Sequence, residues 1–195
     1  MTSQTSGLAG IVLAGGHGTR LGGRDKPAIT LAGRSLLDRT LDAVADADPL
    51  IVVGPSRPVS RKVRWTLEEP AGGGPVAALA AGLDSLTEPT ELVVVLAADH
   101  PWLTGATLRR LVRRLRADGN AGGAVLVDGP GRPQWLLGVW ATDVLRRAVP
   151  RDAAGRALGG VLAGAEPLHV SAVAAETSDV DTPEELSRAL RDFEG

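Results

Sequence analysis

The chain has 195 residues and a mass of 20.0 kDa, with 44% hydrophobic and 23% charged residues. This length and composition are typical of one domain with a substantial core and argue against disorder. The formal net charge of -2 gives no global electrostatic attraction to nucleic acid or to an anionic membrane, so we expect neither as a partner.

The absence of cysteine excludes disulfides and thiolate metal sites, and it is compatible with a reducing compartment. The first residues, MTSQTSG, have neither the basic start nor the apolar core of an export signal. No apolar run approaches the ~20 residues that a membrane-spanning helix needs. We therefore expect a cytoplasmic protein without a membrane span.

The first predicted element is a buried strand over Leu8–Leu13, a short apolar run bounded by glycines. A loop with Arg20 and Lys26 as its main cations follows directly. Glycine allows close backbone approach, successive N–H groups converge on phosphate oxygens, and cations add full charge. We interpret this segment as a phosphate-binding loop; the alternative is a mobile loop with two solvated cations. Its glycines are Gly15, Gly16, Gly18, Gly22 and Gly23.

The next region predicts a short extended piece at 28–31, a helix capped by Ser35, and buried strands at 50–53 and 63–67. The loop after the third strand reads EEPAGGGP and leads into an alanine-rich helix at 76–86. Pro75 suits the first turn of that helix, where its missing N–H costs nothing.

The strand at 92–97 ends just before Asp99. In open parallel α/β sheets, ligands lie beyond the carboxyl ends of the strands, so Asp99 occupies a position typical of a binding site. Magnesium prefers one or two carboxylates together with phosphate oxygens and water, and we predict Asp99 as its ligand. The alternative is a turn or cap residue before Pro101.

Beyond Asp99, Thr104 is expected to cap a helix with an arginine-rich face, which we interpret as solvated. The remaining pattern predicts strands at 124–127 and 134–140, helices after Thr142 and within 155–162, and an edge strand at 168–173. In the final VDTPEEL segment, Pro183 marks a helix start. Asp181 is then either the N-cap or a second magnesium ligand.

Two common phosphate loops do not fit the opening segment. A P-loop needs Ser or Thr after its lysine, whereas Pro27 follows Lys26, and Pro27 also blocks the early helix of a dinucleotide-binding fingerprint. The motif LAGGxGxRLGGxDK, from Leu13 to Lys26, instead resembles the opening signature of Rossmann-like nucleotidyltransferases, most closely the molybdenum cofactor guanylyltransferases. The GGGP loop, the strand ending at Asp99 and the VDTPEEL segment follow in family order.

The resemblance implies a single α/β domain over residues 1–195, a Rossmann-like doubly wound fold of the nucleotide-diphospho-sugar transferase type. Its sheet would be mostly parallel and flanked by helices. The family places an Asp at the end of this strand as its magnesium ligand, which supports Asp99. Backbone contacts to the base and ribose are implied at Leu13, Ala14 and Gly15. We assign phosphate contacts to the backbone of Gly15, Gly16 and Gly18 and charge neutralisation to Arg20 and Lys26.

Base selectivity rests on an acid after the third strand, which aligns best with Glu69 and next with Glu68. A carboxylate there accepts hydrogen bonds from guanine N1 and N2; the alternative is an exposed acid in a proline loop. The chain departs from the family at the nucleotide-site position Gly54, where the family usually has Asn. At Asp181 the guanylyl enzymes often carry Asn, whereas Asp resembles the cytidylyltransferases.

The predicted reaction joins GTP and molybdenum-bound molybdopterin, giving a guanine dinucleotide cofactor and pyrophosphate, with Mg²⁺ and no covalent nucleophile. The acceptor pocket is expected near Trp135 and Trp140, although core packing explains these tryptophans equally well. The alternatives are transfer of CMP to the same cofactor, transfer of a nucleotide to a sugar phosphate, and a nucleotide-binding regulator without activity. We expect a monomer or small homo-oligomer, with transient contacts to proteins of cofactor synthesis.

Overall fold

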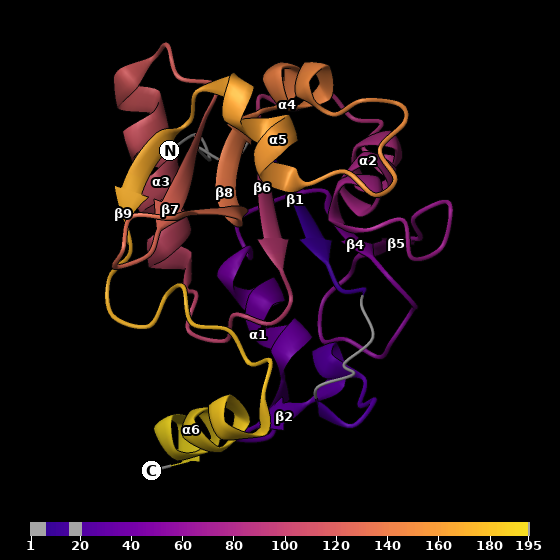
Figure 1. The fold of residues 1–195 in the computed structure, drawn as a ribbon, viewed down its shortest axis with the longest axis vertical. Coiled ribbons are helices and arrows are strands. Elements are labelled where there is room, and N and C mark those ends of the chain that lie inside the picture. Colours follow the sequence, from indigo (N-terminus) through magenta and orange to yellow (C-terminus); the bar gives the residue numbers. More distant parts are fainter. Residues whose placement is uncertain (1–6, 16–20, 195) are drawn as a thin grey trace.

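The computed structural model describes residues 7–15 and 21–194, and within them a seven-stranded sheet lies between two layers of helices (Figure 1). Across the sheet the strands follow the order β5-β4-β1-β6-β8-β7-β9, and only β8 runs antiparallel to its neighbours. The strands are β1 (Leu8–Leu13), β4 (Leu50–Val53), β5 (Arg64–Thr66), β6 (Leu92–Ala97), β7 (Gly123–Val127), β8 (Pro133–Ala141) and β9 (Leu168–Ser171). The expectation of a mostly parallel, doubly wound sheet is confirmed.

Helices cover both faces of the sheet. One face is covered by α1 (Leu36–Ala43) and α3 (Gly105–Asp118), and the other by α2 (Pro75–Ser85), α4 (Thr142–Ala148) and α5 (Leu158–Leu162). The last helix, α6 (Pro183–Glu194), lies apart from the sheet beside the hairpin of β2 (Thr30–Leu31) and β3 (Arg34–Ser35) (Figure 1). Short 3₁₀ helices occur at Lys26–Ala28 and Ala163–Ala165. No helix within 7–15 and 21–194 has the length and apolar character needed to cross a bilayer.

The central strands are apolar throughout because both of their faces are buried. In β1, Ile11 and Leu13 pack on the side of α2, whereas Val12 packs on the side of α1 and α3. This two-sided burial explains why the sequence shows continuous apolar runs rather than an alternating pattern. It also fixes the register of β1 against β6, in which Leu13 lies opposite Ala97.

The predicted helix starts are confirmed where a side chain caps the backbone. The hydroxyl of Ser35 accepts a hydrogen bond from the Asp38 amide at 3.0 Å, and Thr104 forms a reciprocal capping box with Thr107. The predicted helix at 155–162 is reduced to Leu158–Leu162, since glycine-rich sequence disfavours longer helical segments. The edge strand ends at Ser171.

The order of the strands reverses between β1 and β6. The chain proceeds from β1 outward to β4 and β5, and then returns through α2 to place β6 on the other side of β1. A reversal of this kind opens a crevice at the carboxyl ends of the two strands. The segments that follow Leu13 and Ala97 therefore meet at the edge where a ligand site is expected.

Candidate active site

A cavity of about 360 Å³ lies at the carboxyl edge of β1 and β6. Its walls come from the segment after β1, the loop before α2, the loop after β6 and the start of β8, and they include Leu13, Gly15, Glu68, Gly74, Asp99 and Leu136. Pro75, at the first turn of α2, also lines it. A second cavity, of about 440 Å³, lies between α1 and α3 and shares none of these residues. Only the first contains the predicted metal ligand.

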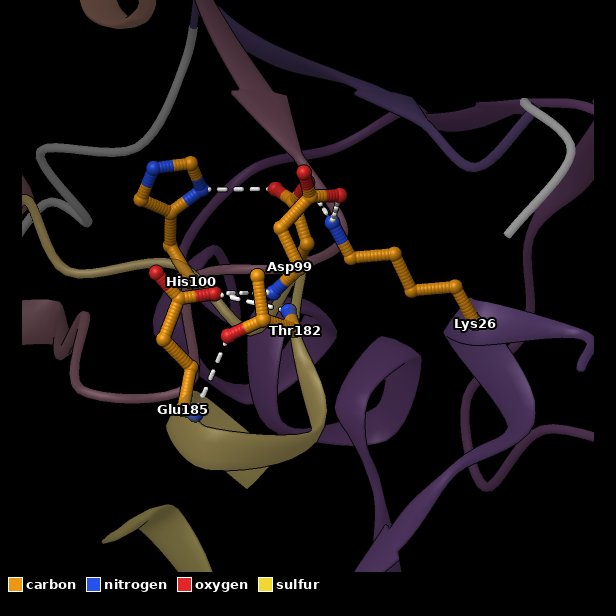
Figure 2. Close-up of polar contacts among 6 residues, drawn as sticks. Lys26, Asp99, His100, Thr182 and Glu185 are labelled. Carbon is orange, nitrogen blue, oxygen red and sulfur yellow. Dashed lines mark hydrogen bonds and ion pairs between the residues drawn. The ribbon is translucent and has the colours of Figure 1, made fainter. Parts of the chain in front are cut away.

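The Lys26 ammonium contacts two carboxylates, one of which, Asp99, lines this cavity. Its Nζ donates to Asp99 Oδ2 at 2.8 Å and to Asp181 Oδ1 at 3.0 Å. Figure 2 shows the Lys26 side chain directed toward Asp99, which in turn contacts His100. The structure therefore brings together three of the predicted site residues from segments 73 and 155 positions apart in the chain.

The charges of this cluster stabilise one another. Burial alone would lower the pKa of Lys26, but Asp99 and Asp181 outweigh it and raise that pKa above its ordinary value of 10.5. Burial likewise favours a higher pKa for Asp99, but the hydrogen bond with His100 and the Lys26 charge hold that pKa well below its usual range. Asp99 is therefore an anion and Lys26 a cation at neutral pH.

His100 makes a contact with Asp99 that was not predicted from the sequence. Its Nδ1 lies 2.7 Å from Asp99 Oδ1, the carboxylate oxygen that does not face Lys26. A protonated Nδ1 donates this hydrogen bond and fixes the orientation of the carboxylate. Adjacency to Asp99 in the sequence was the available signal, but a histidine before proline is more often a turn residue.

Lys26 does not pair with Asp25, its neighbour in the sequence. Asp25 instead receives two hydrogen bonds from the Arg57 guanidinium, at 2.6 and 2.7 Å. This arrangement leaves the Lys26 side chain to extend toward the site, where only 14% of it is exposed.

Asp181 does not act as the N-cap of α6. That position belongs to Thr182, whose hydroxyl accepts from the Glu185 amide at 3.2 Å, while Glu185 Oε2 accepts from the Thr182 amide at 2.8 Å (Figure 2). The same Glu185 oxygen accepts from the Asp181 amide at 2.8 Å. The capping box thus fixes the backbone of Asp181 while its carboxylate faces Lys26.

The two glutamates after β5 point to different cavities. Glu68 lines the cavity at the carboxyl edge, and its Oε1 accepts from the Gly72 amide at 3.3 Å. Glu69 lines a separate cavity with Asp84 and Arg151, on the outer side of α2. The structure therefore brings Glu68, the second choice from the sequence, to the site and places Glu69 outside it.

Gly54 lies behind the site rather than in it. Its φ is +149°, and a Cβ at this position would lie only 2.7 Å from the Ala14 carbonyl oxygen. Strand β4 therefore ends in close contact with the backbone between Ala14 and Gly15. An asparagine, as the family usually has here, would require that backbone to move, so this chain has no side chain for base contacts at this position.

The remaining predicted residues have different outcomes. Gly16, Gly18 and Arg20 lie outside the described residues. Trp140 is fully buried and packs in the core, and Trp135 packs beside Gly159 of α5. The two tryptophans therefore do not line an acceptor pocket together. Leu136, which follows Trp135 in the sequence, is the β8 residue that lines the cavity at the carboxyl edge.

The chain matches a known protein family over most of its length. Residues 10–180 match the MobA-like NTP transferase domain. The chain belongs to this family. The match spans β1 to the residue before Asp181, so it includes the edge where Lys26 meets Asp99.

Two similar proteins are named molybdenum cofactor guanylyltransferase. The chain is 34% identical over 160 residues to the molybdenum cofactor guanylyltransferase of Rhodopseudomonas palustris (strain BisB5), covering 73% of this chain and 72% of that one. It is 32% identical over 166 residues to that of Nitrobacter hamburgensis (strain DSM 10229 / NCIMB 13809 / X14), covering 78% and 77%.

Among solved structures, Rv0371c from Mycobacterium tuberculosis H37Rv matches with a TM-score of 0.74 at 21% identity, over 98% of this chain and 100% of that one. A structure of Rv0371C in complex with manganese matches with a TM-score of 0.70 at 19% identity, over 95% and 99%. Molybdopterin-guanine dinucleotide biosynthesis protein A from Archaeoglobus fulgidus gives 0.65 at 21%, over 94% and 97%.

The donor set of this MobA-like NTP transferase domain fits a hard divalent cation that also binds substrate. Asp99 and Asp181 direct one oxygen each at a single cationic nitrogen, within 3.0 Å. No group of three or more His, Asp or Glu side chains capable of holding a metal occurs among the described residues. Two carboxylates, with phosphate and water completing the shell, are the arrangement that Mg²⁺ prefers.

Proposed function

We propose that this chain transfers GMP from GTP to the terminal phosphate of a molybdopterin-type acceptor, with release of pyrophosphate. An acceptor oxygen attacks the α-phosphorus of GTP as the bond to the β-phosphate oxygen breaks. The observation that carries this proposal is the meeting of Lys26, Asp99 and Asp181 beside the cavity at the carboxyl edge of β1 and β6. The choice of GTP as donor and of a molybdopterin-type acceptor follows from the names of the relatives, molybdenum cofactor guanylyltransferase.

The residues of the site have separable roles in this reaction. Leu13 and Gly15, at the end of β1, line the cavity, and we assign contacts to the nucleoside to the backbone from Leu13 to Gly15. The Lys26 ammonium is proposed to neutralise triphosphate charge, because it contacts Asp99, which lines the same cavity. Arg20, in the opening motif, is proposed for the same task.

Asp99 and Asp181 are proposed to hold Mg²⁺, which would supply positive charge that stabilises the phosphate groups in the transition state. Their two oxygens face one point, which the Lys26 ammonium occupies in this structure. Binding of the ion there requires the Lys26 side chain to turn away from the carboxylates, and the triphosphate would receive its charge. His100 keeps the Asp99 carboxylate oriented through its other oxygen.

Glu68 is the proposed acceptor of the guanine N1 and N2 hydrogen bonds. Its carboxylate lies near Gly15, where a Cβ would be 3.8 Å from Glu68 Oε2. Guanine presents two adjacent donors that a carboxylate can accept together, whereas adenine and cytosine do not offer that pattern. Gly54 has no side chain to contact the base. Of the two described acids that line the cavity, Asp99 is assigned to the metal, so Glu68 is the one proposed for the base.

The test is pyrophosphate release by the purified protein with Mg²⁺ and molybdenum-bound molybdopterin, in parallel reactions with GTP, CTP and ATP. Release with GTP, dependent on the acceptor, is the expected result. Release with CTP in preference to GTP would assign the cytidylyl alternative, which the carboxylate at Asp181 favours on sequence grounds. Nucleotide binding without pyrophosphate release under any combination would contradict transferase activity.

A further inference from the structure

Glu176, in the loop between β9 and α6, has a buried carboxylate that accepts four hydrogen bonds. The residue is 8% exposed. Its Oε1 accepts from the Thr107 hydroxyl at 2.6 Å and from Arg110 at 3.1 Å, and its Oε2 accepts from Arg110 at 2.6 Å and from the Val173 amide at 2.7 Å. Burial favours a higher pKa for this carboxyl, but the hydrogen bonds from Arg110, Thr107 and Val173 outweigh burial and lower the pKa.

These donors connect two parts of the chain that carry the site. Thr107 and Arg110 lie in the first turns of α3, and α3 begins directly after the loop of Asp99. Val173 lies in the loop that leads to Asp181. Through one carboxylate, Glu176 therefore fastens the loop before α6 to the helix that follows Asp99.

The connection continues to the reacting edge through the backbone. The Val180 amide donates to the Asp99 carbonyl at 3.0 Å, and Val180 is fully buried. Asp181 is the next residue, with its amide held by Glu185 at 2.8 Å. The chain is thus anchored after Asp181 by the α6 capping box and before Asp181 by Val180 and Glu176.

We propose that Glu176 is a positioning residue for the divalent cation, because it holds the Asp181 loop against the Asp99 loop so that both carboxylates face one ion. This inference rests on the proposed function. A buried Arg–carboxylate pair is weak evidence for a stability role, because apolar residues of similar volume often serve as well. A bidentate Arg–carboxylate pair fixes the relative orientation of the two groups, and here it would fix the loop that leads to Asp181 against α3.

The test measures Mn²⁺ affinity by electron paramagnetic resonance with a non-hydrolysable GTP analogue present, because phosphate oxygens complete the shell of the ion, for the wild type and for Glu176→Gln. Glutamine keeps the shape of the side chain but removes the charge and turns one acceptor into a donor. We expect the affinity to fall about tenfold, the lower end of the effect of outer-shell partners on metal sites. Glu88→Gln is the matched control, because Glu88 also receives two hydrogen bonds from one arginine, Arg64, at the far edge of the sheet.

A double-mutant cycle separates positioning from general loss of structure. If Glu176 acts through Asp181, Glu176→Gln weakens Mn²⁺ binding in the wild type but not in the Asp181→Asn background. Equal weakening in both backgrounds, or no weakening in the wild type, overturns the proposal. If Glu176→Gln fails to fold, Arg110→Lys replaces it, since lysine keeps the charge but cannot form the bidentate contact.

The two proposals fail differently in this experiment. A wild type that does not bind Mn²⁺, or whose binding survives Asp99→Asn, contradicts the proposed metal site and with it the role of Glu176. A wild type that binds through Asp99 and Asp181, with Glu176→Gln unchanged, contradicts only the role of Glu176.

Discussion

Asp99 and Asp181 contact the same ammonium, but the chain positions them in different ways. Asp99 follows β6, a strand that is buried along its whole length beside β1. Asp181 follows a loop outside the sheet, and this loop is held by hydrogen bonds that the Glu176 and Glu185 carboxylates accept and by one that the Val180 amide donates. A carboxylate on a central strand is thus fixed by the core, whereas a carboxylate on a connecting loop needs dedicated polar contacts. The first should tolerate changes in its surroundings better than the second.

The largest expected effect is that of Asp99→Asn on turnover. The substitution removes the anionic ligand of the metal, which is worth several kcal/mol of transition-state stabilisation, so we expect a loss of at least about a hundredfold. The measurement is the rate of pyrophosphate release at saturating GTP and Mg²⁺. Circular dichroism should show an unchanged fold, since the strand supports this position. Turnover at the wild-type rate would remove Asp99 from the site.

A smaller effect is expected for Asp181→Asn. Asparagine keeps an oxygen toward the ion and loses the charge of a carboxylate that is held by a loop, which corresponds to about 1–2 kcal/mol, or roughly 5- to 30-fold in rate. The measurement is the dependence of turnover on Mg²⁺ concentration, where the variant should need more metal. If Asp181→Asn lost more activity than Asp99→Asn, the loop rather than the strand would carry the principal ligand.

Glu68 and Glu69 provide a matched pair of neighbours. Because only Glu68 lines the cavity at the carboxyl edge, Glu68→Gln should raise the KM for GTP by about tenfold, the cost of a lost charged hydrogen bond. Glu69→Gln should leave the KM near the wild-type value. Steady-state kinetics with GTP and ATP check both variants. An effect of Glu69→Gln larger than that of Glu68→Gln would restore the alignment-based assignment.

The smallest expected effect is on stability as a function of pH. The folded-state pKa of Asp99 lies below its ordinary value of 3.8, so its contribution is present above that pH and is lost as the pH falls. Lys26 has a raised pKa, so its contribution is present below 10.5 and is lost as the pH rises through the raised value.

The difference in unfolding free energy between the wild type and Asp99→Asn should therefore stay constant near neutral pH and narrow below about pH 4. Urea denaturation at several pH values measures it. A difference that widens in acid would contradict the ion pair between Lys26 and Asp99.

The sequence predicted the sheet and the strand-borne half of the site, because continuous apolar runs and the rule for carboxyl ends depend on local pattern. It did not predict the antiparallel direction of β8, since strand direction depends on tertiary pairing. It also ranked Glu69 above Glu68, because spacing in a glycine-rich loop does not determine which side chain faces inward. The role of Thr182 as the cap was visible in the T-x-x-E spacing with Glu185, but Asp181 was the competing candidate.

The most direct measurement is a crystal structure with a non-hydrolysable GTP analogue and Mn²⁺, with the ion located by its anomalous scattering. We expect the ion beside Asp99 and Asp181, with the Lys26 ammonium displaced toward the triphosphate, and the guanine base beside Glu68, in the cavity at the carboxyl edge of β1 and β6. An ion bound away from both carboxylates, or the nucleotide in the cavity between α1 and α3, would contradict this expectation.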